Sequence, residues 1–513
     1  MNTPHPKLKS IFHGLFSMLR ALVVMMVLTF ASLTFVDDAK AAPVLRQINI
    51  SFDEPFDIAK VRQSLEHHCG KEVTVEILQS VLDEVNEYFH DNGYPTSKAY
   101  FPEQVSDDGV ITVAVLNPYL EDIEFKNTSH VKIETRRKLM ADVLKQTGHA
   151  VNSKEMDSAL LKLQDLYAFR TSGTYVRAKS GNDHMILRLT MRPMKHQYPF
   201  KAFVDNHGSK ASGEYRLGIA GGARNLTGHA DNLNYFFMGT NEKMLDGALG
   251  YRLPLNFHPT VLGLGLNAGS YELSDEYEKL GAKGYSYGAD AYLEEPLLRS
   301  RSYGLKTRLG GRLRYLEDRF DLFDVRFKKR QTSGFLELSG FYKYKGFLFQ
   351  GSSSVTMGKS KNLDEYESSP EGAFTLFNAD ASLAYRIIPG TVAKLNTAMQ
   401  KSSRPLDGAL RFSAGGAQKV SAFRSSEACG DEAMFGQIEL TQKLNDNFLI
   451  TPHLDGAKIA NKHGKSAFIK GAGLKLGFEV DGFFANLDAT TAIGKLHGRD
   501  KARVLMSFGY MLA

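Results

Sequence analysis

Apolar residues recur along this chain with two different spacings, one before about residue 195 and another after it. In the stretch 74–89 they fall three or four positions apart and share one face of a helix. In the stretch 245–255 they fall two positions apart, so one face of a strand is apolar and the other is polar or glycine. The first spacing predicts amphipathic helices and the second predicts β-strands. We therefore expect the fold class to change near residue 195.

The part of the chain before that change predicts two modules with the same element order, residues 42–118 and 119–194. In each module the pattern predicts a strand, two helices and two further strands. Thr74 stands where an N-cap is expected, and Asn152 with Glu155 forms a capping-box pattern. A module of about 75 residues can bury one face of a sheet under two helices. We therefore expect two small α+β (β-α-α-β-β) domains.

Residues 195–513 predict a transmembrane β-barrel. The alternation continues to the end of the chain, and about sixteen strands can be marked, each taking about 20 residues with its connection. An even number of antiparallel strands closes the sheet and leaves no unpaired edge in lipid. A soluble β-sheet protein also alternates, but here the second face is rich in glycine, serine and charged residues over many strands. The expected fold is mainly β, with a 16-stranded antiparallel barrel behind the two modules.

The N-terminus predicts a signal peptide over residues 1–41. Basic residues come first, namely Lys7, Lys9 and Arg20. An uncharged apolar run follows over 21–36, and then a small-x-small cleavage site, Ala39-Lys40-Ala41. The alternative is an uncleaved anchor, although the run is slightly short for a spanning helix. No later apolar run approaches the length of a membrane-spanning helix.

Composition narrows the classes of function. The 513 residues carry a formal net charge of only +6, so no nucleic-acid partner is expected. The 46 glycines, 33 phenylalanines and 22 tyrosines suit tightly twisted sheets with aromatic rings at the membrane interfaces. The two cysteines, Cys69 and Cys429, lie too far apart for a disulfide framework.

Candidate chemistry is sparse. His67, His68 and Cys69 resemble a metal cluster, but adjacent helical residues point in different directions and no further ligand pair is suitably spaced. We expect an exposed helix end there, and no metal or other cofactor. His453 has no companion that would make a catalytic cluster, and the modules contain no catalytic arrangement. The chain is therefore not expected to be an enzyme.

Several motifs resemble one family, the TpsB outer-membrane transporters of two-partner secretion, which include the haemolysin secretion/activation proteins. The stretch DNGYPTSKAYFPEQ (91–104) is similar to its first polypeptide-transport-associated (POTRA) domain, with landmarks at Gly93, Tyr94, Pro102 and Gln104. Asn225-Leu226-Thr227-Gly228 with Asp231 resembles the turn into the third barrel strand. GYRLPL (250–255) and EPLLRSR (295–301) resemble two further barrel segments. The resemblance covers about 44–513 and identifies both modules as POTRA domains.

The resemblance also implies a long lumenal loop, about 413–432, between barrel strands eleven and twelve. Its tip corresponds to Val420-Ser421-Ala422-Phe423, and Gly430-Asp431 leads into the next strand. The family pairs an arginine at the tip with an acid on the barrel wall. The residue of this chain that resembles that acid is Asp455. This chain departs from that pattern, because Ser421 replaces the arginine and Ala422 the glycine. We hypothesise that Arg424 reaches Asp455 instead; the alternative is a surface loop beside an ordinary lumenal Asp455.

The resemblance implies a location in the bacterial outer membrane with the POTRA domains in the periplasm. There the POTRA pair would capture an unfolded secreted exoprotein (TpsA-like), and the barrel would export it; whether export also activates the cargo stays open. The expected partners are that cargo, outer-membrane lipid, and the barrel assembly machinery during biogenesis. A plug helix before the first POTRA domain is not expected, and Phe508 and Tyr510 would serve as the assembly signal. Alternatives are an insertase of the POTRA-barrel assembly superfamily and a passive porin.

Overall fold

The structure is a computed structural model. It describes residues 43–512 except 53–57, 105–107, 182, 256–259, 365–369, 426, 463, 465 and 495–501. The predicted signal peptide and the expected lack of a plug helix concern residues outside this range. The chain divides into two compact units, the first formed mainly by residues up to 116 and the second mainly by residues from 117 onward.

The first unit has the predicted β-α-α-β-β order. Its elements are β1 (Gln47–Ser51), α2 (Ile58–Leu65), the 3₁₀ helix η1 (Glu66–His68), α3 (Val75–Asp91), β2 (Lys98–Tyr100) and β3 (Val110–Leu116). The central strand β3 pairs with β1 in parallel and with β2 antiparallel. Helix α3 buries Val81, Val85 and Phe89 on one face, as its apolar spacing predicts. The Thr74 hydroxyl accepts a hydrogen bond from the Ile77 N–H at 3.3 Å, which confirms the N-cap.

The second POTRA module repeats this order at the start of the second unit. Its elements are β4 (Tyr119–Asn127), α4 (Ile133–Leu139), α5 (Ala141–Leu144), α6 (Ser153–Gln164), β5 (Phe169–Arg177) and β6 (His184–Pro193). The sheet order is β4-β6-β5. Asn152 caps α6 by accepting from the N–H groups of Lys154 and Glu155. The first of the two helices expected in this module is split into α4 and α5 at Met140.

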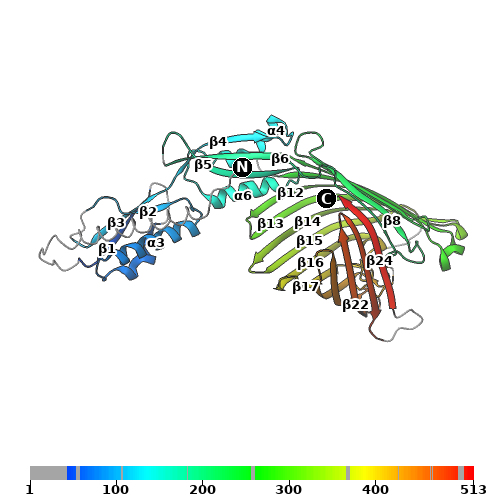
Figure 1. Cartoon of the computed structure of the whole chain (residues 1–513). Coiled ribbons are helices and arrows are strands. Elements are labelled where there is room, and N and C mark those ends of the chain that lie inside the picture. Colours follow the sequence, from blue (N-terminus) through cyan, green and yellow to red (C-terminus); the bar gives the residue numbers. More distant parts are fainter. Residues whose placement is uncertain are drawn as a thin grey trace, which may run out of the picture. The chain divides into compact units, whose positions relative to one another are not determined.

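Sixteen antiparallel strands then form a closed barrel, in which the last strand pairs with the first. Figure 1 shows these strands sweeping round the barrel wall. They are β7 (Phe200–Asp205), β8 (Arg216–Arg224), β9 (Asn232–Thr240), β10 (Leu245–Pro254), β11 (Val261–Glu272), β12 (Ala282–Arg299), β13 (Tyr303–Phe320), β14 (Val325–Tyr344), β15 (Phe347–Asn362), β16 (Gly372–Ile388), β17 (Thr391–Ser402), β20 (Glu432–Lys443), β21 (Phe448–Ala460), β22 (Ala467–Val480), β23 (Phe483–Ala492) and β24 (Ala502–Leu512). The predicted strand number and closure are confirmed.

The outside of the barrel is apolar and the inside is polar. On β13, Leu309 and Leu313 are exposed on the outer surface, while Lys306 and Arg312, of opposite parity, line cavities inside. This alternation is what a strand between lipid and a wet lumen requires. Among the helices that the structure describes, none is both long and apolar enough to cross a bilayer.

The expected long loop joins β17 to β20, the eleventh and twelfth barrel strands. It spans residues 403–431 and so begins earlier than the predicted 413. It contains a 3₁₀ turn, η4 (Gly408–Leu410), and a small hairpin formed by β18 (Phe412–Ser413) and β19 (Cys429–Gly430). Two further 3₁₀ turns, η2 (Asp275–Leu280) and η3 (Asp321–Phe323), lie between wall strands.

Candidate functional site: a loop seated inside the barrel

The base of the loop is held by the predicted Gly430-Asp431 pair. The Asp431 carboxylate is almost fully buried and accepts hydrogen bonds from the N–H of Leu406 at 2.9 Å and of Lys462 at 3.0 Å. One side chain thus joins the beginning of the loop, its end, and the chain just beyond β21. Gly430 lies close to β21, where an added Cβ would come 3.0 Å from the carbonyl oxygen of Ala460. The pair therefore fixes how the loop enters β20.

The tip of the loop is buried against the inner wall. Val420 and Ser421 have no exposed surface, and Ala422 and Phe423 are nearly as buried. Val420, Ala422 and Phe423 form one apolar cluster with wall residues of β17, β20 and β21, namely Ala398, Ala433, Phe435, Ala457 and Ile459. A surface loop would expose such residues to water. The surface-loop alternative is therefore wrong, and the loop is folded into the lumen.

Ser421 makes the polar contacts of the tip. Thr490 on β23 donates to the carbonyl oxygen of Ala472 at 3.2 Å, so the Ser421 hydroxyl donates to Thr490 at 3.0 Å. Asp455 lies 3.5 Å from the same hydroxyl, which is the outer limit of a hydrogen bond. The guanidinium of Arg503 on β24 donates to the Ser421 carbonyl oxygen at 3.1 Å. Wall strands thus contact the tip from several sides.

Below the tip, His453 lies between two buried carboxylates. Its Nδ1 is 3.1 Å from Asp455 Oδ2, and its Nε2 is 3.0 Å from Asp488 Oδ1. Both ring nitrogens can donate only when the ring is protonated; a neutral ring would turn a lone pair toward a carboxylate. His453 therefore supplies a positive charge shared by two acids of the wall. The expectation that it has no companion is wrong, because Asp455 is two positions away on its own strand and Asp488 lies on β23.

The hypothesis that Arg424 reaches Asp455 is also wrong. The Arg424 guanidinium pairs with Glu214, in the connection between β7 and β8, at 2.6 Å. The tip is a tight turn in which Arg424 runs back beside Gly415, so its side chain starts from the stem of the loop. The buried Oδ1 of Asp455 has no hydrogen-bond partner among the residues that the structure describes. No loop arginine therefore occupies the place opposite Asp455.

Two glycines of β22 make room for this cluster. In the strand register Asp455 is opposite Gly471 and His453 is opposite Gly473. A Cβ at Gly471 would come 2.5 Å from Asp455 Oδ1, and a Cβ at Gly473 would come 2.4 Å from His453 Nε2. Because these positions lack side chains, His453 reaches across β22 to Asp488 on β23. The glycines look like ordinary barrel alternation in the sequence, so sequence reasoning missed them.

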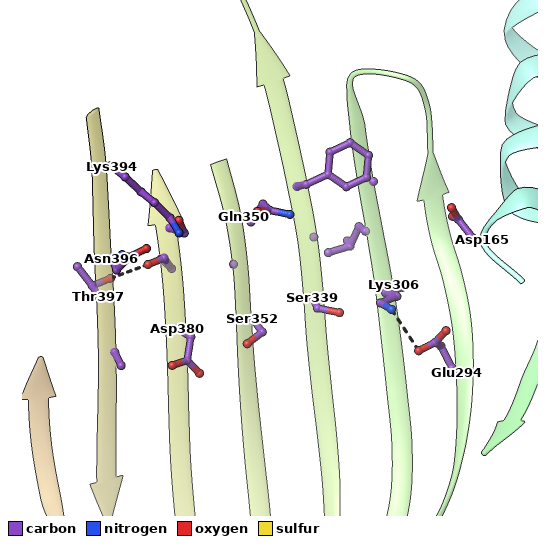
Figure 2. Close-up of a pocket in the computed structure, with 18 of the residues that line it drawn as sticks. Asp165, Glu294, Lys306, Ser339, Gln350, Ser352, Asp380, Lys394, Asn396 and Thr397 are labelled. Carbon is purple, nitrogen blue, oxygen red and sulfur yellow. Dashed lines mark hydrogen bonds and ion pairs between the residues drawn. The ribbon is translucent and has the colours of Figure 1, made fainter. Parts of the chain in front are cut away.

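A cavity of about 810 Å³ remains beside the seated loop. Figure 2 shows its polar side chains projecting from neighbouring wall strands, with Asp165 of the second POTRA module at one end. Glu294 on β12 is nearly buried and gathers three cations, Arg252 at 2.6 Å, Arg308 at 2.5 Å and Lys306 at 3.2 Å. The lumen is therefore partly filled by the loop and otherwise lined by paired charges and amides.

The predicted barrel turn connects the second POTRA module to the barrel. The Asn225 side-chain amide donates to the Ser129 carbonyl oxygen at 3.0 Å, and the Lys132 N–H donates to the Gly228 carbonyl oxygen at 2.9 Å. Gly228 and Asn225 both have positive φ angles, which a tight turn favours. The motif thus has a structural role at this contact.

Asp231 organises the inside of that turn. Its carboxylate accepts hydrogen bonds from the Thr227 N–H at 3.0 Å and from the Tyr251 phenol at 3.0 Å. Burial acts to raise the pKa of Asp231, but the hydrogen bonds outweigh burial and lower the pKa below its usual value. The carboxylate is therefore ionised at neutral pH.

A second contact between POTRA module and barrel was not foreseen. Arg299, at the end of β12, donates to both carboxylate oxygens of Asp165, at 2.6 and 2.9 Å. This bidentate arrangement fixes direction as well as distance. Arg299 belongs to the EPLLRSR segment, so the motif itself was a usable signal.

The POTRA landmarks have local structural roles. Gln104 pairs with Thr112 of β3 in both directions, accepting at 2.7 Å and donating at 2.8 Å. Gly93 follows α3 with φ of 101°, the left-handed conformation that favours glycine. Tyr94 and Pro102 are half-buried.

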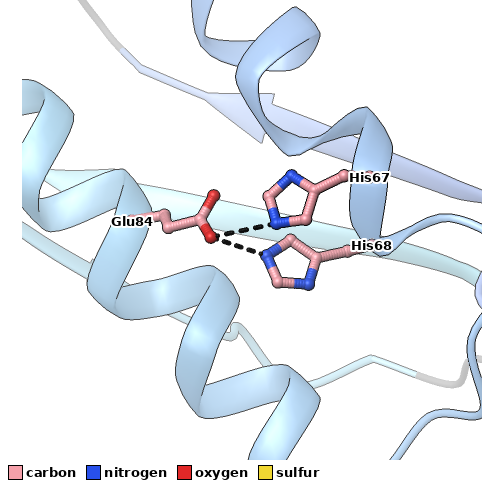
Figure 3. A group of neighbouring side chains, drawn as sticks. All are labelled: His67, His68 and Glu84. Atoms are coloured by element: carbon pink, nitrogen blue, oxygen red, sulfur yellow. Dashed lines mark hydrogen bonds and ion pairs between the residues drawn. The ribbon is translucent and has the colours of Figure 1, made fainter.

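The expectation for His67, His68 and Cys69 needs correction. His68 is buried, and both histidine rings face Glu84 of α3 (Figure 3). Both adjacent rings contact the same Glu84 carboxylate oxygen, and Glu84 is the ligand-type residue that sequence spacing did not reveal, because it lies on the separate helix α3. Cys69 is exposed and is a free thiol.

Comparison with known proteins identifies relatives of this architecture. The family model described as haemolysin secretion/activation protein ShlB/FhaC/HecB matches residues 184–480, and a ShlB-type POTRA domain model matches 44–117. The heme/hemopexin transporter protein HuxB of Haemophilus influenzae is 24% identical over 393 residues, covering 74% of this chain and 68% of the relative.

Solved structures show the same fold. CdiB from Escherichia coli has a TM-score of 0.77 at 17% identity, with both chains fully covered. BamA from Haemophilus ducreyi, lacking POTRA domains 1–3, has a TM-score of 0.53 at 14% identity, covering 91% of this chain and all of that one.

Replacing His453 tests its role as the shared cation. His453→Leu leaves Asp455 and Asp488 buried without a positive partner, which should cost about 3 kcal/mol of barrel stability. We expect the barrel to unfold at a lower temperature when it is heated in detergent. The change in its electrophoretic mobility on a gel measures that unfolding. Adding Asp455→Asn and Asp488→Asn should recover most of the loss. A single variant that unfolds at the wild-type temperature would contradict the role.

Gly473 and Gly477, both on β22, allow a matched steric test. Gly473→Ala places a methyl group against the His453 ring, whereas Gly477→Ala, of the same parity, meets atoms only at ordinary contact distance, 3.5 Å and beyond. The first variant should unseat the loop and raise single-channel conductance in planar lipid bilayers, and the second should not. Equal conductance of the two variants would show that the space at Gly473 does not matter.

Proposed function

Since the chain belongs to the haemolysin secretion/activation protein family ShlB/FhaC/HecB, the family of two-partner secretion transporters, we propose that it captures one unfolded secreted partner in the periplasm and exports it through its barrel. It is an outer-membrane β-barrel protein with POTRA modules. In this proposal the POTRA modules lie in the periplasm. The observation that carries it is the loop seated in the lumen.

The seating of the loop supports a gate that opens. The tip is joined to the wall through a small set of side-chain contacts, centred on Ser421, and through one apolar cluster. It adds no strand to the wall, so its departure leaves the backbone pairing of the barrel intact. A lumen of sixteen strands is wide enough for an aqueous path once the loop has moved. Export in an extended conformation would follow that path.

The POTRA sheets offer places where an extended cargo can bind. In the second module β5 pairs with β6 on one side, and among the described strands nothing pairs with its other edge. An extended peptide can add to such an edge through main-chain hydrogen bonds, largely independent of its sequence. The same module is joined to the barrel at Asn225, Gly228 and Arg299. Cargo captured on this edge would therefore be held near the entrance of the barrel.

The proposed partners follow from this mechanism. The cargo is a secreted exoprotein of the TpsA type. The relative HuxB is named as a heme/hemopexin transporter. Outer-membrane lipid surrounds the apolar wall, and the barrel assembly machinery inserts it. We propose that the transporter itself performs no catalysis, since capture on one side and folding on the other supply direction.

An insertase is the alternative closest to this function, and BamA shares the fold. An insertase delivers its substrate sideways into the membrane, whereas an exporter passes it through the lumen. The buried loop tip packs against the inner wall and therefore occupies the lumen, which is the route that an exporter uses. It therefore supports export. A passive porin would need neither the seated loop nor the POTRA modules.

Removing the first POTRA module tests capture. Deleting residues 44–118 while keeping the signal sequence should abolish release of the proposed TpsA-type exoprotein, measured in culture supernatant after the two proteins are produced together. The barrel should still reach the outer membrane and show heat-modifiable mobility, because its closure does not involve those residues.

Each outcome of the deletion has a meaning. Undiminished release from an assembled, truncated barrel would contradict capture by the first POTRA module. Normal release together with depletion of other outer-membrane proteins would favour an insertase.

A further inference from the structure

Three side chains of the first POTRA module converge on one point. His67 and His68, on η1, lie with their Nε2 atoms 3.2 and 3.0 Å from the same carboxylate oxygen of Glu84 on α3. The three ligand-type atoms all lie within 4.8 Å of one another. Figure 3 shows both rings turned toward the carboxylate from one side. This cluster is separate from the loop and the lumen of the barrel.

The hydrogen bonding of His67 indicates that a proton or a metal cation lies between its Nε2 atom and the Glu84 carboxylate. Its Nδ1 lies 2.9 Å from the carbonyl oxygen of Ser64, which can only accept, so Nδ1 carries a proton. In the neutral ring Nε2 then presents a lone pair to Glu84 Oε1, which is also an acceptor. Two acceptors at this distance repel each other unless a cation lies between them or Nε2 is also protonated. A backbone carbonyl on Nδ1 with Nε2 free is the arrangement of most metal-bound histidines.

The dimensions and donor types fit a transition-metal ion. With bonds of about 2.0–2.1 Å in tetrahedral geometry, neighbouring ligand atoms lie about 3.3 Å apart. The observed 3.2 and 3.0 Å therefore need to widen by only a few tenths of an ångström. Two imidazoles and one carboxylate suit Zn²⁺ and its neighbours and do not suit Ca²⁺ or Mg²⁺.

We propose that His67, His68 and Glu84 bind one Zn²⁺-class ion in the first POTRA module. The ion joins η1, at the end of α2, to α3 and so stiffens the two helices that cover the sheet. Three protein ligands leave one coordination position for water or for an incoming side chain. The exposed acids of α3, Glu76, Asp83 and Glu87, lie along the same helix and favour approach of a cation.

The experiment is a calorimetric titration of the full-length chain. The tag-free protein, purified in detergent and stripped with a chelator, is titrated with zinc chloride near neutral pH. We expect one site per chain, with affinity at least tenfold weaker in His67→Ala and in Glu84→Gln. Both residues are accessible enough for replacement without disturbing the core, which does not hold for the buried His68.

Matched controls come from the same helices. His90→Ala on α3 and Cys69→Ser after η1 replace exposed residues outside the cluster, so these variants should bind Zn²⁺ as the wild type does. Circular dichroism of each variant checks that the fold is unchanged.

Two results would overturn the proposal. One is a wild-type chain that binds no Zn²⁺, and the other is equal binding by wild type, His67→Ala and Glu84→Gln. Either would leave a protonated His67 in an ion pair with Glu84 as the account of this cluster. Exoprotein release is not part of the readout, so the metal site and the export function can fail independently.

Discussion

A peptide group in hydrocarbon has no water to bond with, and this constraint shapes most of the chain. Pairing β24 with β7 closes the sheet and leaves no strand edge in the barrel wall. Closure by sixteen strands encloses a lumen, and the side-chain alternation then places charged residues inside and leucines outside. The space inside has to be filled or left to water. The loop between β17 and β20 fills part of it, and its position follows from this constraint.

The seat of the loop depends on charge placed in the wall. The family resemblance implies an arginine at the tip, whereas this chain has Ser421 there and His453 in β21. His453 supplies one positive charge that Asp455 and Asp488 share within the wall, so the tip itself needs only a hydroxyl and a backbone carbonyl. Burying those acids without a cation would be costly. Moving the positive charge from loop to wall therefore keeps the acids paired when the loop leaves.

Much of the fold was predictable because it depends on local periodicity. The two helix-strand modules and the number of barrel strands follow from spacings of three to four or of two, whereas the place of the long loop followed from the family resemblance. The site was less predictable because it depends on strand register. Nothing local shows that Gly473 lets His453 reach Asp488 across β22, or that Arg424 turns back toward Glu214. The convergence of His67, His68 and Glu84 was unpredictable for a similar reason, because they lie on two separate helices, η1 and α3.

The central claim is that the loop must leave its seat for export. Ser421 and Thr490 touch through their hydroxyls at 3.0 Å, so Ser421→Cys with Thr490→Cys, in a background with Cys69 and Cys429 replaced by serine, should form a disulfide that locks the tip to β23. Exoprotein release should stop under oxidising conditions and return on adding reductant, while each single cysteine variant exports normally. Full release from the oxidised, crosslinked transporter would contradict the account.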